Sequence, residues 1–191
     1  MSHSTSTTPP SASEYPVDAD SGGVLIPLGG KKHPGLFAIV DAVDAPKVLE
    51  HGWSAFRPSP RGDRVLLYVK CTSNNKSVYL HRFILGVTDP KVKIDHENHN
   101  GLDCRQSNLR IVTHQQNTFN RRPNLNARSR YKGVWWHYAV DKWCAGITMN
   151  GKRKHLGVYD NEIDAAISYD VAAHELFGEH AYLNFPNEAS L

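Results

Sequence analysis

The sequence lacks any long apolar run that could cross a membrane, and it begins with no secretory signal. Cysteine is also scarce. Cys71, Cys104 and Cys144 are far apart and form no paired Cys or Cys/His pattern, which excludes a zinc ribbon. We therefore expect a reduced, cytoplasmic protein with no membrane partner.

Acidic residues are almost missing from residues 105–154. Asp141 is the only acid there and stands against eleven basic residues. Because the whole chain carries only +3, the remainder is net acidic. A merely solvated charged surface would mix both signs, so this window predicts a polyanionic partner.

Aliphatic residues are nearly absent from residues 1–23, which are rich in Ser, Thr, Pro and Ala. Such a segment cannot offset the entropy of ordering, so we expect a disordered tail. Residues 24–80 instead predict a small β-rich module with a short helix capped by Asp44. The sequence of this module shows no pattern of metal ligands or nucleophiles. Its role could be to pack against the rest of the protein or to contact a DNA backbone.

Residues 92–122 carry the chemistry. A short strand over residues 92–96 alternates in polarity and ends in the pair Asp95-His96. A polar loop containing glycine leads to a second strand at residues 109–112. Thr113 then opens a helix, with a glutamine three residues later in capping-box register.

Asn117 lies one helical turn beyond Thr113, so it can point back toward Asp95 and His96. A carboxylate, an imidazole and an amide oxygen are thereby brought together. These groups suit a hard divalent cation and a general base for phosphodiester hydrolysis.

The block resembles the HNH nucleases, and within them the homing-type endonucleases of phages and introns. The resemblance is carried by Asp95-His96, by Asn108 in the run NLR and by Asn117 in the run THQQN. It implies a ββα-metal fold in which His96 is the catalytic base and Asn108 braces the loop behind it. It further implies that Asp95 and Asn117 hold one divalent metal ion, Mg²⁺ or alternatively Mn²⁺.

Simpler readings exist for each residue alone. An Asp-His pair is common at solvated strand ends, and Asn108 could be a turn residue. All four residues at the family's spacing, preceded by LHRFILG, favour the nuclease. His81 and Arg82 hold the usual family position in that run, for which we predict a structural or phosphate-contacting role. Cys104 replaces an asparagine of the family's loop, so we expect it to weaken a loop hydrogen bond.

The basic linker, residues 123–130, continues the polar run NRRPNLNARSR. It could be a flexible hinge, a strap along the phosphate backbone, or both. We assign DNA contact to its arginines and to those just before it: Arg121, Arg122, Arg128 and Arg130.

Residues 131–187 predict three strands and a helix. The strands are expected at residues 131–139, 142–149 and 152–159, with an Asn-Gly turn before the last. The helix, residues 162–177, would be capped by Asn161 or Asp160. An apolar stripe should cover the sheet: Ala165, Tyr169, Ala172, Ala173 and Leu176.

This stretch resembles the Apetala2/ethylene-response-factor DNA-binding domain, through the runs YKGVWW, KWCAGI, KHLGVYDNEIDAAISYDVAAHELFG and YLNFP. The resemblance implies that the sheet enters the major groove of DNA. The groove-facing positions would be Lys132, Gly133, Trp135, His137, Gly146, Thr148, Arg153 and His155. Trp136 and Trp143 are predicted to be core residues. Arginines of the plant domains are replaced at several positions, so the plant target site does not carry over.

Together these features predict an α+β protein: a ββα-metal (HNH) nuclease module at residues 81–122, preceded by the small β-rich module and followed by a three-stranded antiparallel sheet packed on one helix. The predicted function is a metal-dependent, site-directed DNA endonuclease of homing or mobile-element type, a hydrolase acting on double-stranded DNA. We expect a monomer without an obligate protein partner, in the cytoplasm of a bacterial or phage-infected cell. The alternatives are a non-catalytic DNA-binding regulator that retains an HNH fold and an RNA-processing nuclease; a groove-reading sheet suits B-form DNA better than RNA.

Overall fold

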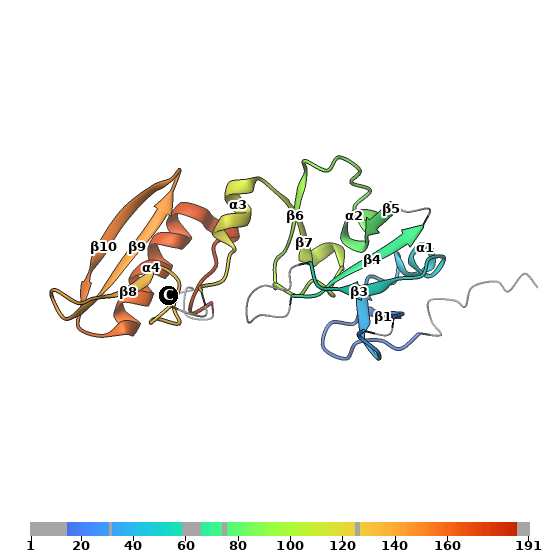
Figure 1. The fold of residues 1–191 in the computed structure, drawn as a ribbon, viewed down its shortest axis with the longest axis horizontal. Coiled ribbons are helices and arrows are strands. Elements are labelled where there is room, and N and C mark those ends of the chain that lie inside the picture. The colour runs from blue at the N-terminus through green and yellow to red at the C-terminus, as the bar shows by residue number, and fades with distance from the viewer. Residues whose placement is uncertain (1–14, 31, 59–65, 74–75, 125–126, 187–191) are drawn as a thin grey trace, which may run out of the picture. The chain divides into compact units, whose positions relative to one another are not determined.

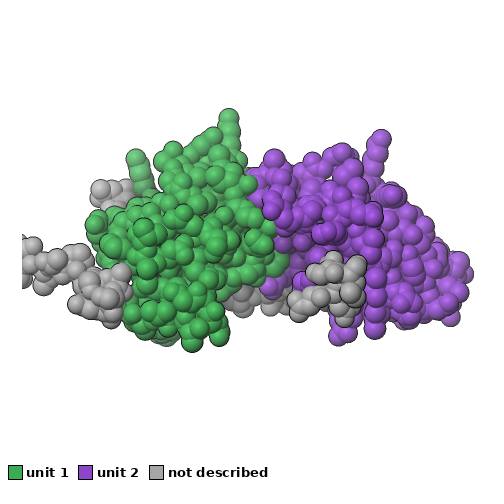
Figure 2. Space-filling view, turned by 180° about the vertical axis from the view of Figure 1, so that it is seen from behind, with its two compact units in different colours: residues 1–111 green, residues 112–191 purple. Residues whose placement is uncertain are grey.

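The computed structural model describes residues 15–186 except 31, 59–65, 74–75 and 125–126. The chain divides into two compact units, residues 1–111 and 112–191 (Figure 2). Most of the tail predicted to be disordered lies outside the described residues. None of the helices in the described ranges is long and apolar enough to span a membrane.

The first unit is built from small antiparallel sheets (Figure 1). Its strands are β1 (Val24–Pro27) paired with β2 (Phe37–Val40), then β3 (Ser54–Phe56), β4 (Tyr68–Ser73) and β5 (Lys76–Tyr79) in one sheet. A further pair is β6 (Lys93–His96) with β7 (Leu109–Val112). The helices are α1 (Ala45–Leu49) and α2 (Leu80–Ile84), and a 3₁₀ turn, η2, covers Gln106–Asn108.

One hydrophobic core holds the first unit together. Val40 of β2 and Val69 of β4 are fully buried in the same cluster as Cys104 and Leu109 of the nuclease-like block. The β-rich module and that block therefore share a core, which favours packing as the role of residues 24–80. Burial of this kind stabilises by about 25 cal/mol per Å² of apolar surface.

Asp44 occupies the N-cap position of α1, as predicted, but its side chain makes no cap hydrogen bond. Its carboxylate instead accepts a hydrogen bond from Gln106 Nε2 at 2.8 Å and pairs with Lys47 at 2.6 Å. A long-range partner has displaced the local cap, because Asp44 is almost fully buried against the nuclease-like block.

The second unit is a three-stranded antiparallel sheet in the order β10-β9-β8, packed on one long helix (Figure 1). Its elements are α3 (His114–Phe119), β8 (Val134–His137), β9 (Lys142–Met149), β10 (Lys152–Tyr159), α4 (Glu162–Phe177) and the 3₁₀ turn η3 (Gly178–His180). Asn150 and Gly151 have φ values of 51° and 73°, which confirms the predicted type I′ turn.

Asn161 is the N-cap of α4, and its side chain accepts a hydrogen bond from Asp164 N at 2.7 Å. Asp160 is not the cap; its carboxylate pairs with Lys142 instead. The sequence had left both candidates open.

The predicted stripe on α4 is correct at Ala165, Tyr169 and Ala173, which are buried against the sheet. It is wrong at Leu176, whose side chain is 40% exposed, whereas Phe177 is buried. The reason is the helical period: Phe177 lies one turn beyond Ala173 and takes the last buried place on that face.

Candidate functional site

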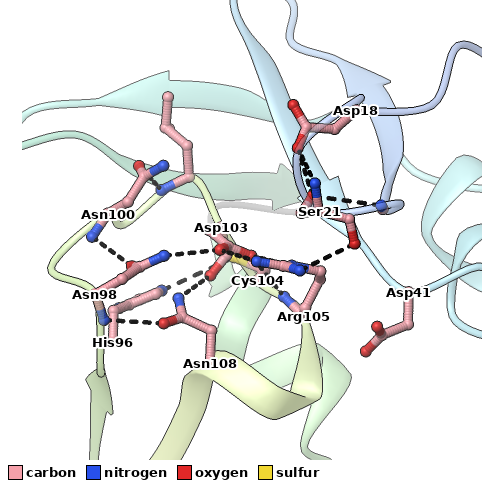
Figure 3. Close-up of polar contacts among 12 residues, drawn as sticks. Asp18, Ser21, Asp41, His96, Asn98, Asn100, Asp103, Cys104, Arg105 and Asn108 are labelled. Carbon is pink, nitrogen blue, oxygen red and sulfur yellow. Dashed lines mark hydrogen bonds and ion pairs between the residues drawn. The ribbon is translucent and has the colours of Figure 1, made fainter.

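The loop between β6 and β7 is closed by Asn108. Its Oδ1 accepts a hydrogen bond from Asn98 N at 3.0 Å, and its Nδ2 donates to the carbonyl oxygen of Asp103 at 2.7 Å (Figure 3). The Asn108 side chain is buried, so these bonds satisfy polar atoms that would otherwise be costly to desolvate. Both ends of the loop are thereby fixed behind His96.

Asp103 is a second residue that holds the loop together through side-chain hydrogen bonds. No role was predicted for it from the sequence. Its carboxylate binds the Arg105 guanidinium at 2.9 and 2.7 Å and accepts from Asn98 Nδ2 at 2.8 Å (Figure 3). The bonds from Arg105 and Asn98 hold the pKa of Asp103 below its usual value, although burial alone would raise it. The loop thus contains a buried, paired charge that stabilises one conformation.

The β-rich module supports this loop directly. Ile39 of β2 donates to Leu102 O at 2.9 Å, and Cys104 N donates to Ile39 O at 2.8 Å. Gln106 N donates to Asp41 Oδ2 at 2.7 Å, and just before the module Ser21 O accepts a hydrogen bond from Arg105 Nη1 at 3.2 Å. Cys104 itself is fully buried in the core, so its side chain contributes apolar packing to the loop.

His96 ends β6 and is only 5% exposed. Its ring lies edge-on to Tyr68 and His81, with centroid separations of 5.6 and 5.2 Å, and its Nε2 is 3.9 Å from Cys104 Sγ. Tyr68 is a neighbour that sequence reasoning missed, because only the tertiary fold brings β4 beside β6.

Burial lowers the pKa of His96 to about 4, because the charged imidazolium loses hydration. The nearby carboxylates of Asp95 and Asp103 oppose this shift without cancelling it. His96 is therefore neutral near pH 7, which is the form that can accept a proton.

Asp95 is ion-paired with Arg110, whose Nη2 lies 2.9 Å from Asp95 Oδ2. Arg110 also approaches Glu97, with 3.8 Å between Nη1 and Oε2. This pair could have been expected from the sequence. Arg110 ends the run NLR and lies on β7, the strand that pairs with β6, which carries Asp95.

The donor set predicted for a metal ion is an aspartate carboxylate and an asparagine amide oxygen. Hard oxygen donors of this kind suit Mg²⁺, which commonly takes one or two protein ligands and keeps several waters. Across the residues that the structure describes, no group of three or more His, Cys, Asp or Glu side chains could form a closed metal site. The Asp95 carboxylate and the Asn117 amide oxygen are each donors of the type that Mg²⁺ takes, and their joint role as ligands stays a prediction.

Asn117 lies in the second unit, on α3. The predicted capping box is confirmed at the start of this helix: Gln116 N donates to Thr113 Oγ1 at 3.1 Å and Thr113 N donates to Gln116 Oε1 at 2.8 Å. Asp95, His96 and Asn108 belong to the first unit, so the role of Asn117 as their partner stays a prediction.

His81 and Arg82 both lie on α2. Arg82 donates to the carbonyl oxygens of Val92, at 3.0 Å, and Asp89, which ties α2 to the chain entering β6. This is the structural role that the sequence offered as one of two options for Arg82. The ring of His81 stacks on Tyr79 at 5.6 Å, and its buried Nδ1 has no hydrogen-bond partner among the residues that the structure describes.

The strand register of the second unit collects the predicted DNA-facing residues of the sheet on one face. Trp135 and His137 lie opposite Cys144 and Lys142, whereas Arg153 and His155 lie opposite Thr148 and Gly146. Opposed residues in an antiparallel pair share a face, and so do alternate residues along each strand. The guanidinium carbon of Arg153 lies 3.7 Å from the centre of the Trp135 ring, a cation–π contact that holds Arg153 on this face.

The opposite face packs on α4. Ala145 and Ile147 are buried there, as their alternation predicts. Trp136 lies opposite Trp143 with ring centroids 5.0 Å apart, and both are half-buried. Trp143 packs against the core as predicted, whereas Trp136 lies under the guanidinium of Arg128 at 5.1 Å.

The remaining predicted DNA contacts have varied surroundings. Arg121 and Arg122 are exposed, and Arg130 donates to Tyr131 OH at 2.8 Å. Lys132 is half-buried, and its ammonium donates to Phe119 O. Gly133 lies against Tyr169, where any Cβ would come within 1.9 Å of the ring, so its lack of a side chain serves packing.

Comparison with known proteins supports both halves of this description. Residues 78–119 match the HNH endonuclease family model. An uncharacterized HNH endonuclease of Acanthamoeba polyphaga mimivirus is 34% identical over 110 residues, which cover 55% of this chain and 56% of the relative. No solved structure matches the chain.

Plant proteins match a shorter stretch. Dehydration-responsive element-binding protein 2D of Arabidopsis thaliana is 43% identical over 63 residues, covering 32% of this chain and 30% of the relative. An AP2-like ethylene-responsive transcription factor of the same plant is 41% identical over 59 residues, covering 30% and 17%. The chain spans about half the length of the viral relative and less than a third of these plant relatives. It therefore contains an HNH endonuclease domain together with a region similar to the AP2/ERF domain.

Proposed function

We propose that this chain is a metal-dependent DNA endonuclease of homing or mobile-element type. The observation that carries the proposal is the loop closed by Asn108, which fixes His96 beside Asp95 at the end of β6. The match to the HNH endonuclease model over residues 78–119 supports the same reaction class. The ββα-metal arrangement, with α3 as its helix, is part of this proposal.

In the proposed reaction, His96 takes a proton from a water molecule, and the resulting hydroxide attacks the scissile phosphorus. The bond from phosphorus to the 3′ oxygen then breaks. The low pKa of His96 keeps its imidazole neutral, as a base must be before the proton is transferred. Asn108 keeps the loop, and hence the imidazole, in one orientation.

Asp95 and Asn117 would hold the metal ion. When bound, a divalent ion stabilises the extra negative charge on the phosphoryl group and on the leaving oxygen. Arg110, which is already paired with Asp95, would add positive charge next to the same carboxylate.

The second unit would hold the DNA. Its sheet face presents exposed Arg153 and His155 next to Trp135, and Arg121 and Arg122 are exposed after α3. Basic side chains of this kind neutralise phosphates, while groove contacts give sequence preference. We propose double-stranded DNA as the partner, a monomeric state and action in the cytoplasm of the host cell, where the three free cysteines would stay reduced.

The test is cleavage of supercoiled plasmid by the purified chain with Mg²⁺ or Mn²⁺, alongside His96→Ala. We expect wild-type cleavage that EDTA abolishes, and a loss of about 10² to 10⁴-fold in His96→Ala, as is typical when a general base is removed. The DNA affinity of the variant should be unchanged. Cleavage by His96→Ala at the wild-type rate would show that another group is the base.

A second candidate is a non-catalytic DNA-binding protein, and the burial of His96 favours it. An imidazole that is 5% exposed must gain access to water and phosphate before it can act as a base. Plasmid that stays intact at every metal concentration, together with salt-sensitive duplex binding, would establish this function in place of the nuclease.

A further inference from the structure

The helix that carries Asn117 cannot be stable by itself. α3 has only six residues, and none of them is buried. An isolated helix of this length is marginal even with a good sequence, so its position must come from contacts outside the helix. Those contacts are found within the second unit, and they lie at both ends of α3.

At the C-terminal end, Phe119 stacks on Phe177 of α4 with ring centroids 3.6 Å apart and ring planes 10° from parallel. Phe177 is a buried core residue, packed with Ile147, Tyr169 and Ala173. The last side chain of α3 thus packs on the buried core of the unit, where α4 meets the sheet.

The backbone at the same point is also anchored. The carbonyl oxygen of Phe119 accepts a hydrogen bond from Tyr182 N at 3.1 Å and another from the Lys132 ammonium. A cation at a helix C-terminus interacts favourably with the unpaired carbonyls there. Burial lowers the pKa of Lys132 to about 8, so the ammonium is still mostly protonated at neutral pH.

The N-terminal half of α3 is tied to the β9–β10 hairpin. Gln115 Nε2 donates to Asn150 Oδ1, in the type I′ turn, at 2.5 Å. The same hairpin carries Arg153 on the face proposed to read DNA. One element therefore touches both α3 and the proposed DNA surface.

We propose that the sheet and helix α4 of the second unit position α3, and with it the Asn117 side chain, through an anchor formed by Phe119, Phe177 and Lys132. These three are positioning residues for cleavage: they act on Asn117 rather than on the substrate. The inference rests on the proposed function, because it takes Asn117 to be a metal ligand. The second unit would therefore position a metal ligand in addition to holding DNA.

The test uses the full chain with Phe119→Ala, because Phe119 is half-buried at the edge of the core and its removal leaves Phe177 and α4 in place. Phe119→Tyr keeps the stacking ring and serves as the conservative rescue. Thr118→Ala is the matched control, since the Thr118 hydroxyl donates its hydrogen bond within α3, to His114 O. Lys132→Met removes the ammonium contact separately.

Two readouts separate the anchor from the chemistry. The first is the NMR order parameter of the Asn117 backbone amide. It should fall from about 0.85 toward 0.6 or lower in Phe119→Ala, while the backbone amides of α4 stay rigid. The second is cleavage at saturating DNA, which should fall about 10- to 100-fold, with a higher half-saturating Mg²⁺ concentration and unchanged DNA affinity. Lys132→Met should lower the order parameter and the cleavage rate at saturating DNA in the same direction. Lys132 is also a predicted DNA contact, so unchanged affinity is expected of Phe119→Ala alone. Phe119→Tyr and Thr118→Ala should match wild type.

An unchanged Asn117 order parameter in Phe119→Ala would overturn the anchor, even in a protein that cleaves. A mobile α3 with wild-type cleavage and Mg²⁺ dependence would overturn the positioning role. A wild-type chain that cleaves nothing while its α3 responds as expected would overturn the proposed nuclease function and leave the anchor established.

Discussion

The carboxylate of Asp95 is held by the guanidinium of Arg110, with 2.9 Å between Oδ2 and Nη2, and both side chains are largely buried. A fixed positive charge so close to a proposed metal ligand opposes the approach of a divalent cation. Arg110→Gln removes that charge while keeping a hydrogen-bond donor. We expect the half-saturating Mg²⁺ concentration for cleavage to fall several-fold, most clearly at low salt.

The measurement is the cleavage rate across a Mg²⁺ series at fixed ionic strength. A higher Mg²⁺ requirement in Arg110→Gln would mean that Arg110 orients Asp95 for the metal rather than competing with it. Lys93→Gln is a suitable control, because it removes an exposed positive charge from the strand that carries Asp95 without touching the Asp95 carboxylate's ion pair.

The two proposed metal ligands should contribute unequally to Mg²⁺ binding. Asp95→Ala should raise the Mg²⁺ requirement more than Asn117→Ala, since a carboxylate supplies charge and an amide only a dipole. Both variants should keep their affinity for duplex DNA. Metal titration of cleavage by each variant tests this order, and a larger effect from Asn117→Ala would reverse the assignment of the dominant ligand.

Arg153 should matter for DNA binding more than its charge alone predicts. Arg153→Ala should weaken duplex binding by about 1–3 kcal/mol, if the arginine contacts a base, and reduce the salt slope by about 0.9 if it contacts a phosphate. Lys142→Ala removes the same formal charge from the sheet, but the Lys142 ammonium is paired with Asp160 at 2.7 Å, so its loss should change little. Binding isotherms over a salt series distinguish the two, and equal effects would show that only net charge counts.

The first unit should lose stability in acid through His81. Burial, and the charges of His96 and Arg82, lower the pKa of folded His81 to about 3, whereas the unfolded chain binds the proton near the ordinary value of 6.5. The unfolded state therefore binds more protons between pH 6.5 and 3. Stability contributed by neutral His81 is complete above this window and is lost as the pH falls, by up to about 1.4 kcal/mol per pH unit.

Urea denaturation at several pH values, followed by the NMR amide signals of residues in this unit, measures that slope. His81→Gln cannot titrate and should reduce the slope; the part that remains is expected from His96, whose pKa burial lowers to about 4. His137→Gln, an exposed histidine of the second unit, should leave it unchanged. An equally steep slope in His81→Gln would place the acid sensitivity in other groups.

Local pattern was enough to predict much of the fold. The capping box at Thr113, the Asn150-Gly151 turn and the buried alternation of Ala145 and Ile147 all appear as expected. Each of these features depends on residues a few positions apart in the chain. Over such short distances the backbone conformation and the alternation of side chains follow from the local sequence. For the same reason the spacing of Asp95, His96 and Asn108 could be recognised as a motif.

Contacts between distant segments were decided only by the tertiary structure. Gln106 rather than a local amide takes the Asp44 carboxylate, Tyr68 reaches His96 from another sheet, and Phe119 stacks on Phe177. The sequence alone was enough to identify the groups that we propose to carry the chemistry and to predict the strands and helices that bear them. Which partners those groups have depends on burial and on long-range packing, because a desolvated charge or ring takes whichever partner the folded core brings beside it.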